Sequence, residues 1–247
     1  MKQYQDYLFD LYGTLVDIHT DEGKRRLWNT MAACYSAHGA AYDAAGLRAE
    51  YSRRCAEETA RLQAAHPCAA VEIDLLRVFR GLYAACGISP DTTLLAETAW
   101  AFRRASTTHL RAYAGAGELL DALRAAGKTV ILLSNAQSCF TRPELALLGL
   151  AERFDRIYIS SEVGFQKPDA RFFTAPLREL GIGAADCLMI GNDPVCDVGG
   201  AAAVGMDAVY IHSALSPKDA PRQLPAAVYS LPEMDLKRLK ALCLAEP

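Results

Sequence analysis

Short apolar runs that alternate with helix-like segments are the feature that most constrains the fold of this chain. One run, residues 7–9, stands near the start, and four more follow in the second half, at 129–133, 156–159, 187–190 and 208–211. Most of their residues are apolar, with β-branched and aromatic types among them, and polar or glycine residues bound them. Strands that read as apolar throughout are typical of a parallel sheet with helices on both faces. The alternation therefore predicts an α/β, doubly wound, Rossmann-like parallel sheet.

The segment between residues 18 and 112 has a different character. No β-rich run occurs there, and Ala, Leu, Arg and Glu dominate with apolar residues at helical spacing. The spacing predicts four helices, near 21–38, 44–64, 71–85 and 91–110. We therefore expect two domains, an α/β core made of residues 1–17 and 113–247 and a helical domain, residues 18–112, inserted after the first strand.

Composition and charge argue against several classes of protein. The 26 Lys and Arg residues against 29 Asp and Glu give a formal net charge of −3, so no positive field attracts nucleic acid. No run approaches the roughly 18 apolar residues of a membrane span, and the first residues lack the apolar region of a signal peptide. The eight cysteines are scattered without a CxxC pair, which suits reduced thiols. We expect a cytoplasmic protein with neither nucleic-acid nor membrane partners.

Polar residues follow the predicted strands, at the edge of the sheet where ligands of open parallel sheets bind. A carboxylate there can attack phosphorus, a lysine and a hydroxyl can hold phosphoryl oxygens, and further carboxylates can bind Mg²⁺. The residues in question are Asp10, Thr14, Ser134, Asn135, Lys167, Asn192, Asp193 and Asp197. Together these residue types favour phosphate chemistry.

Four segments in this order resemble the four motifs of the haloacid dehalogenase-like hydrolase superfamily. They are Asp10-Leu11-Tyr12-Gly13-Thr14, Ser134-Asn135, Lys167-Pro168-Asp169, and Gly191-Asn192-Asp193 with Asp197. The insertion after the first motif is similar to the small helical cap of subfamily I. The resemblance implies a hydrolase whose Rossmann-like core carries an inserted helical cap domain.

The resemblance also implies a role for each matching residue. Asp10 would be the nucleophile and Lys167 the cation that neutralises it, with Ser134 and Tyr12 in the catalytic set. Substrate contacts would come from Thr14, Ser134, Asn135 and Lys167, and Mg²⁺ ligands from Asp10, the Tyr12 carbonyl, Asp193, Asn192 and Asp197. For Asp197 two interpretations stay open: it acts at the metal water or orients the lysine, or it caps the helical segment 198–204. Asp17 is expected to be a structural cap.

Tyr12 departs from the phosphatase pattern. Phosphatases of the superfamily carry at this position a second Asp that protonates the leaving group, whereas an unperturbed phenol has a pKa near 10. Tyrosine here resembles the 2-haloacid dehalogenases, in which halide leaves without a proton and no metal is used. Their cap offers an arginine to the substrate, and Arg25 or Arg26 could serve. The segment Gly191-Asn192-Asp193, however, keeps the form of the metal-binding motif, although the neutral Asn192 lowers its negative charge.

We therefore expect a Mg²⁺-dependent phosphatase that acts on a small phosphorylated metabolite through an aspartyl-phosphate intermediate. Two alternatives remain. The first is a 2-haloacid dehalogenase-type hydrolase, and the second is a protein that binds a phosphorylated ligand with weak or no turnover because the acid carboxylate is missing.

Overall fold

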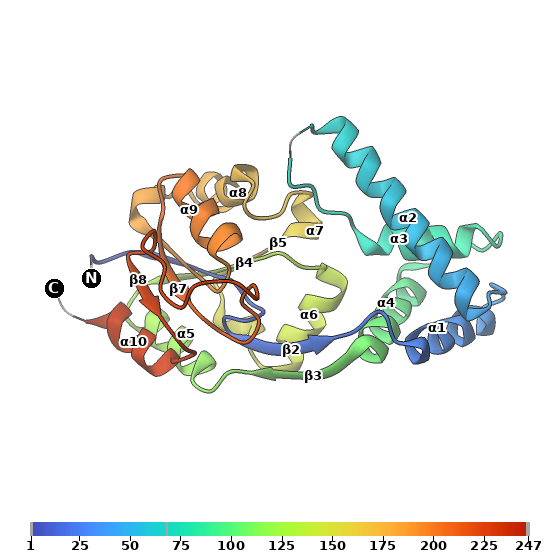
Figure 1. Ribbon diagram of the computed structural model, residues 1–247, viewed down its shortest axis with the longest axis horizontal. Coiled ribbons are helices and arrows are strands. Elements are labelled where there is room, and N and C mark those ends of the chain that lie inside the picture. Colours follow the sequence, from blue (N-terminus) through green and yellow to red (C-terminus); the bar gives the residue numbers. More distant parts are fainter. Residues whose placement is uncertain (1, 68, 246–247) are drawn as a thin grey trace.

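The computed structural model describes residues 2–67 and 69–245 (Figure 1). Its centre is a six-stranded parallel sheet with the order β5-β4-β1-β6-β7-β8. The strands are β1 (Asp6–Phe9), β4 (Thr129–Ser134), β5 (Arg156–Ile159), β6 (Cys187–Gly191), β7 (Asp207–Ile211) and β8 (Tyr229–Leu231). The predicted doubly wound sheet and its first five strands are confirmed. The remaining strand, β8, is a three-residue edge strand that contains a serine, and it is not among the predicted strands.

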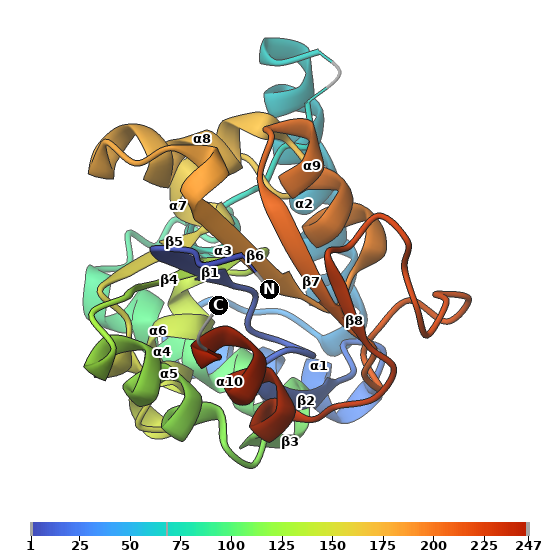
Figure 2. The same cartoon turned by 90° about the vertical axis from the view of Figure 1, so that its left-hand side faces the viewer.

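Helices cover both faces of the sheet, as Figure 2 shows, and alternate residues of the central strand pack into two different clusters. Tyr7 and Phe9 pack into a cluster with α5 (Ala116–Ala125), α6 (Ser138–Leu147) and α10 (Leu236–Leu244). Leu8 packs on the opposite face, in a cluster with residues of α8 (Ala170–Leu180) and α9 (Gly200–Ala203). Both faces are therefore buried, which explains why the strands read as continuous apolar runs.

Three helical turns and one short helix complete the core. The turns are η1 (Ala151–Arg153), η2 (Ala184–Asp186) and the π-helical η3 (Pro194–Gly199), and the short helix is α7 (Ser160–Val163). Phe9 of β1 pairs with Leu132 of β4 and Ile190 of β6. The chain segments that follow these three strands consequently emerge side by side at one edge of the sheet.

The helical cap contains α1 (Arg25–Ala37), α2 (Ala44–Ala65), α3 (Leu75–Ala84) and α4 (Thr92–Ser106). Asp43, Asp74 and Asp91 begin α2, α3 and α4, each accepting a hydrogen bond from a backbone N–H of the first turn. The third helix starts later than the expected residue 71, because Val71 instead forms an isolated bridge with Phe165 of the core.

The cap has its own aromatic core, in which Trp28, Tyr51, Phe79 and Phe102 pack together. Phe140, which belongs to α6 of the sheet domain, joins this cluster, and its ring stacks on Phe102 at 6.0 Å with an interplanar angle of 6°. Apolar packing therefore continues from the cap into α6.

Two antiparallel strands, β2 (Val16–Thr20) and β3 (Thr107–Ala112), connect the cap to the core. The expectation of helix through residue 110 is wrong at this end, since the chain extends from Thr107 onward to pair with β2. Asp17 is also not the expected structural cap. It lies in β2, where it accepts a hydrogen bond from Arg111 at 2.7 Å and pairs with the His109 Nε2 at 3.1 Å. Burial alone would raise the pKa of the Asp17 carboxyl, but these two partners lower it below its ordinary value.

Within the described residues, no helix combines the length and the apolar character needed to cross a membrane.

Candidate active site

Asp10 follows β1 directly and is 8% exposed, at the edge of the sheet where β4 and β6 also end. A tight turn follows it. Gly13 has φ +90°, and a Cβ atom there would lie 2.4 Å from the Asn192 side chain, so only glycine fits. Thr14 is buried and donates its hydroxyl to Oδ2 of Asp10 at 3.2 Å, with Oδ1 of Asn192 at 3.4 Å. The turn thus fixes one carboxylate oxygen of Asp10.

Lys167 holds the other oxygen. Its Nζ lies 2.8 Å from Oδ1 of Asp10 and 2.7 Å from Oδ1 of Asp197, and the whole residue is 2% exposed. Burial alone would lower the pKa of Lys167, but the carboxylates of Asp10 and Asp197 raise it above its ordinary value. The lysine is therefore a protonated cation shared between two buried carboxylates.

Asn135 positions the backbone of Lys167. Its Nδ2 donates to the Lys167 carbonyl at 3.0 Å, and its Oδ1 accepts from the Lys167 N–H at 2.7 Å. Both polar groups of the Asn135 amide thus bond to the backbone of Lys167. The side chain, which is predicted to contact substrate, also lines the cavity above Asp10.

Ser134, at the end of β4, is fully buried, and its hydroxyl is one of two buried side-chain atoms in the described residues that have no hydrogen-bond partner. Buried hydroxyls are normally paired. Ser134 does not line the cavity above Asp10.

The segment after β6 places two carboxylates differently. Asp193 accepts hydrogen bonds from the N–H groups of Val195 and Cys196, both at 2.8 Å, and so begins η3. Asp197 accepts from the Asp193 N–H at 2.8 Å and pairs with Lys167 through its other oxygen. Asp197 is therefore not the cap of segment 198–204. Of the two interpretations, its contacts match the one that orients the lysine.

These side chains meet around a cavity of about 170 Å³. It is lined by Asp10, Tyr12, Asn135, Lys167, Asn192, Asp193, Cys196, Asp197 and Leu215. A larger cavity of about 470 Å³ shares Tyr12, Asn135 and Leu215 with it and extends between core and cap, where Glu22, Leu75 and Arg103 contribute. The cavity above Asp10 and the cavity beside the cap are thus lined in part by the same residues.

The donors around the small cavity match a hard cation only in part. Among residues 2–67 and 69–245, no three His, Cys, Asp or Glu side chains are arranged to hold a metal ion by themselves. Asp197 uses both oxygens in hydrogen bonds, so it is unsuited to direct ligation. Asp10, Tyr12 and Asp193 line one cavity, and together these residues carry two carboxylates and a backbone carbonyl that could serve as ligands. This oxygen set fits Mg²⁺, which keeps several waters and needs one or two carboxylates.

The side chain of Tyr12 turns toward α6. Its hydroxyl donates to Oε2 of Glu144 at 2.5 Å and lies 3.0 Å from Oγ1 of Thr141, and Arg103 of the cap forms an ion pair with the same Glu144. Burial, together with the Glu144 charge, raises the pKa of the Tyr12 phenol. Glu144 and Arg103 are not among the site residues predicted from the sequence. The one available signal was a carboxylate three residues after Thr141 on an otherwise apolar helix face.

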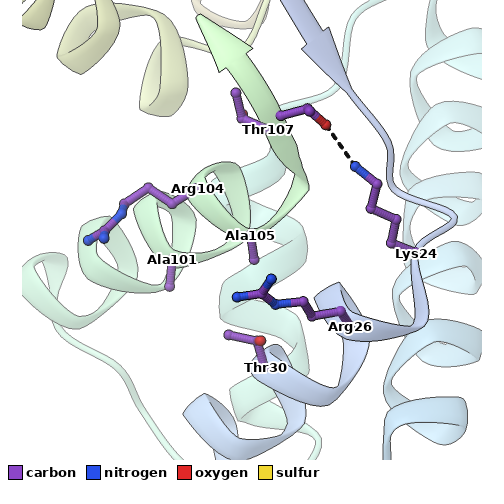
Figure 3. Close-up of a pocket in the computed structure, with 8 residues that line it drawn as sticks. Lys24, Arg26, Thr30, Ala101, Arg104, Ala105 and Thr107 are labelled. Carbon is purple, nitrogen blue, oxygen red and sulfur yellow. Dashed lines mark hydrogen bonds between the residues drawn. The ribbon is translucent and has the colours of Figure 1, made fainter.

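The arginines considered for a dehalogenase lie elsewhere. Arg26 lines an open hollow of about 630 Å³ on the cap, together with Lys24 and Arg104 (Figure 3). Arg25 lines a further hollow beside Trp28. Arg103 is the cap arginine that lines the cavity next to Tyr12.

Comparisons with known proteins identify the family. Residues 7–205 match the family model of the haloacid dehalogenase-like hydrolases. The chain is 35% identical over 143 residues to a phosphoserine phosphatase of Thermus thermophilus, a match that covers 58% of this chain and 56% of that protein. It is 28% identical over 222 residues to (S)-2-haloacid dehalogenase 1 of a Pseudomonas species, with 86% of each chain covered. The chain matches about half of the length, or less, of the first phosphatases it resembles.

Solved structures share the fold. A HAD phosphatase from Thermococcus onnurineus superposes with a TM-score of 0.57 at 18% identity, covering 98% of this chain and 99% of that one. A dehalogenase superposes with a TM-score of 0.58 at 20% identity, and both chains are covered completely. With the buried Asp10–Lys167 pair at the edge of a parallel sheet and a family model that spans most of the chain, this protein belongs to the haloacid dehalogenase-like hydrolases.

Proposed function

We propose that this hydrolase is a Mg²⁺-dependent phosphatase of small phosphorylated metabolites, with Asp10 as nucleophile and residues 18–112 as a cap over the core of 1–17 and 113–247. The observation that carries the proposal is Asp193, a second carboxylate in the small cavity of Asp10. Two carboxylates that face one cavity repel each other unless a cation lies between them. In a dehalogenase that uses no metal, the Asp193 carboxylate would serve only to begin η3.

Asp10, the Tyr12 carbonyl and Asp193 would hold the ion, with Asn192 beside them. Bound Mg²⁺ would neutralise phosphoryl oxygens and fix their orientation. The proposed ion is distinct from the Lys167 cation, which pairs with Asp10 and Asp197.

The chain's own residues then account for the proposed steps. A carboxylate oxygen of Asp10 attacks phosphorus, a new O–P bond forms, and the bond to the leaving oxygen breaks. The leaving oxygen takes a proton from water. The Tyr12 hydroxyl does not supply this proton, because it donates its hydrogen bond to Glu144. Water then attacks the acyl phosphate and releases inorganic phosphate, which restores the carboxylate. Lys167 neutralises Asp10 throughout, and Thr14 keeps its second oxygen in place.

The experiment is a screen for phosphate release from many phosphoesters, acetyl phosphate among them, with and without Mg²⁺. Turnover that needs Mg²⁺ supports the proposal. Chloride release from 2-chloropropionate in the presence of a chelator would favour the dehalogenase, the candidate supported by Tyr12 and by the relative matched over 86% of its length. Absent turnover together with thermal stabilisation by phosphorylated ligands would favour a binding protein.

The cytoplasmic location and the small-molecule substrate are parts of the same proposal. The net charge of −3 supports the absence of nucleic-acid partners.

A further inference from the structure

Arg103 of the cap reaches into the core and meets a buried carboxylate of α6. Its Nε lies 2.5 Å from Oε1 of Glu144 and its Nη2 3.2 Å from Oε2, so the pair is bidentate. The two side chains are 13% and 2% exposed. A buried pair of this kind is costly to break from one side only, because the remaining charge is left without a partner.

Two aromatic rings enclose the guanidinium. Its carbon lies 5.5 Å from the centre of the Tyr12 ring and 5.1 Å from that of Phe140. Phe140 in turn stacks on Phe102 of α4. Cation–π contact and apolar packing therefore hold α4 against α6 at this point. We call Tyr12, Arg103, Phe140, Thr141 and Glu144 the Arg103 cluster.

Glu144 connects this docking contact to the nucleophile loop. Its Oε2 accepts hydrogen bonds from the Arg103 Nη2 and from the Tyr12 hydroxyl. Thr141, which lies on the same helix as Glu144, also contacts this hydroxyl. Tyr12 is two residues from Asp10, and the carbonyl of the intervening Leu11 accepts hydrogen bonds from the N–H groups of residues 14, 15 and 16 at 2.8–3.2 Å. A shift of Glu144 or Arg103 would therefore move the Tyr12 side chain, which contacts both residues, and with it this loop.

We propose that Glu144 and Arg103 are positioning residues for Asp10. Arg103 of the cap holds the Glu144 carboxylate in place, and Glu144 holds the Tyr12 hydroxyl. Tyr12 in turn keeps residues 10–14 in the geometry in which the Asp10 carboxylate faces the substrate. The role rests on Asp10 being the nucleophile proposed above, and it is the same for attack on phosphorus or on carbon. Correct placement of reacting groups within an ångström is worth orders of magnitude in rate.

The test compares Tyr12→Phe, Glu144→Gln and the double variant with the wild type. Rates are measured on acetyl phosphate with Mg²⁺, or on 2-chloropropionate if the wild type turns over that compound instead. We expect each single variant to lower kcat roughly tenfold while KM stays within about twofold. The double variant should lose no more than the worse single variant, because both changes remove the same contact.

Tyr12→Phe removes one oxygen and leaves the Arg103–Glu144 pair intact, so it should fold even if Glu144→Gln does not. Glu162→Gln is the matched control. Glu162 of α7 forms an exposed pair with Arg142 of α6, the helix that carries Glu144, and the loss of this pair should leave kcat unchanged.

Losses in kcat that multiply in the double variant would overturn the proposal, as would a Tyr12→Phe enzyme with wild-type kcat. If Glu144 had only a structural role, Glu144→Gln would lower the melting temperature and leave kcat of the folded enzyme unaltered. That result would also contradict the proposal. A wild type that turns over neither substrate would instead refute the proposed function, and the two failures are thus distinguishable.

Discussion

The ammonium group of Lys167 lies 2.8 Å from Oδ1 of Asp10, and the same nitrogen lies 2.7 Å from Asp197. One buried cation thus serves two buried carboxylates, and these three side chains together carry an excess of one negative charge. This excess determines how substitutions at the site affect stability and turnover.

Asp10→Asn is expected to abolish turnover and to leave the fold intact. The amide keeps the shape of the side chain but lacks the nucleophilic oxygen, and the remaining Lys167–Asp197 pair is electrically balanced. Steady-state kinetics and a thermal melt check this, with a melting temperature equal to or above that of the wild type. A variant that retains a tenth of the wild-type rate would show that Asp10 is not the nucleophile.

Lys167→Met should destabilise the protein by about 3–5 kcal/mol, because it leaves two buried carboxylates without their cation. The free energy of unfolding in urea measures the effect. The double variant Lys167→Met with Asp10→Asn should regain part of the loss, since one of the two uncompensated charges is gone. Equal stabilities of the single and double variants would argue against charge repulsion as the cause.

Chelation of divalent metal ions is expected to abolish turnover, and Mg²⁺ should restore it. Asp193→Asn should raise the Mg²⁺ concentration needed for half-maximal rate at least tenfold, since a neutral amide is a weaker ligand. An Asn at this position can still begin η3, so the variant should melt close to the wild-type temperature. Full activity in excess chelator would favour dehalogenation.

The leaving group should govern the rate of the wild type. General acid help contributes ~10²–10⁴-fold in enzymes that have it, and the Tyr12 hydroxyl is engaged by Glu144. Aryl and acyl phosphates should therefore be cleaved much faster than alkyl phosphates. Tyr12→Asp should narrow the gap by accelerating the alkyl esters, because acid help of ~10²–10⁴-fold outweighs the roughly tenfold loss expected from breaking the contact with Glu144. Similar wild-type rates for both classes, with no gain from the variant, would mean that another residue supplies the proton.

Asp169 should make stability depend on pH in the acid range. Hydrogen bonds from Arg171, with further ones from backbone N–H groups, lower the pKa of Asp169 to about 2. The ionised carboxylate therefore stabilises the fold above the ordinary pKa near 4, and this contribution disappears as pH falls through about 2. Asp169→Asn should cost about 1 kcal/mol at pH 6 after allowance for solvent screening. Urea unfolding at several pH values should show the difference shrinking below pH 4, and a constant difference would contradict the assignment.

The sheet and the side chains at its edge could be predicted from the sequence because both follow from local pattern. Each central strand contains a run of apolar residues, and Asp10, Lys167 and Asp193 stand directly after strands or in the connecting loops. The β2–β3 ribbon could not be predicted in this way. Residues 107–112 contain Thr, His and Arg and lack a run of apolar residues, and they become a strand only because β2 lies beside them.

Arg103 and Glu144 escaped prediction for a related reason. Forty-one positions separate them, and neither belongs to a motif that the sequence displays. Their pairing depends on how α4 packs on α6, which follows from the aromatic contact between Phe102 and Phe140. Helical spacing predicts that both helices exist but does not predict which faces meet.

Thr20 of β2 pairs with Thr107 of β3, so the helical insertion leaves the core and re-enters it at a single rung of the ribbon. No strand of the sheet depends on how long the insertion is. In the course of evolution, an insertion of another size can replace this one between Thr20 and Thr107 without a change in the residues at the edge of the sheet that carry the proposed chemistry. One buried carboxylate limits the exchange: a new insertion would have to bring its own cation to Glu144, or Glu144 would have to be replaced in the same step.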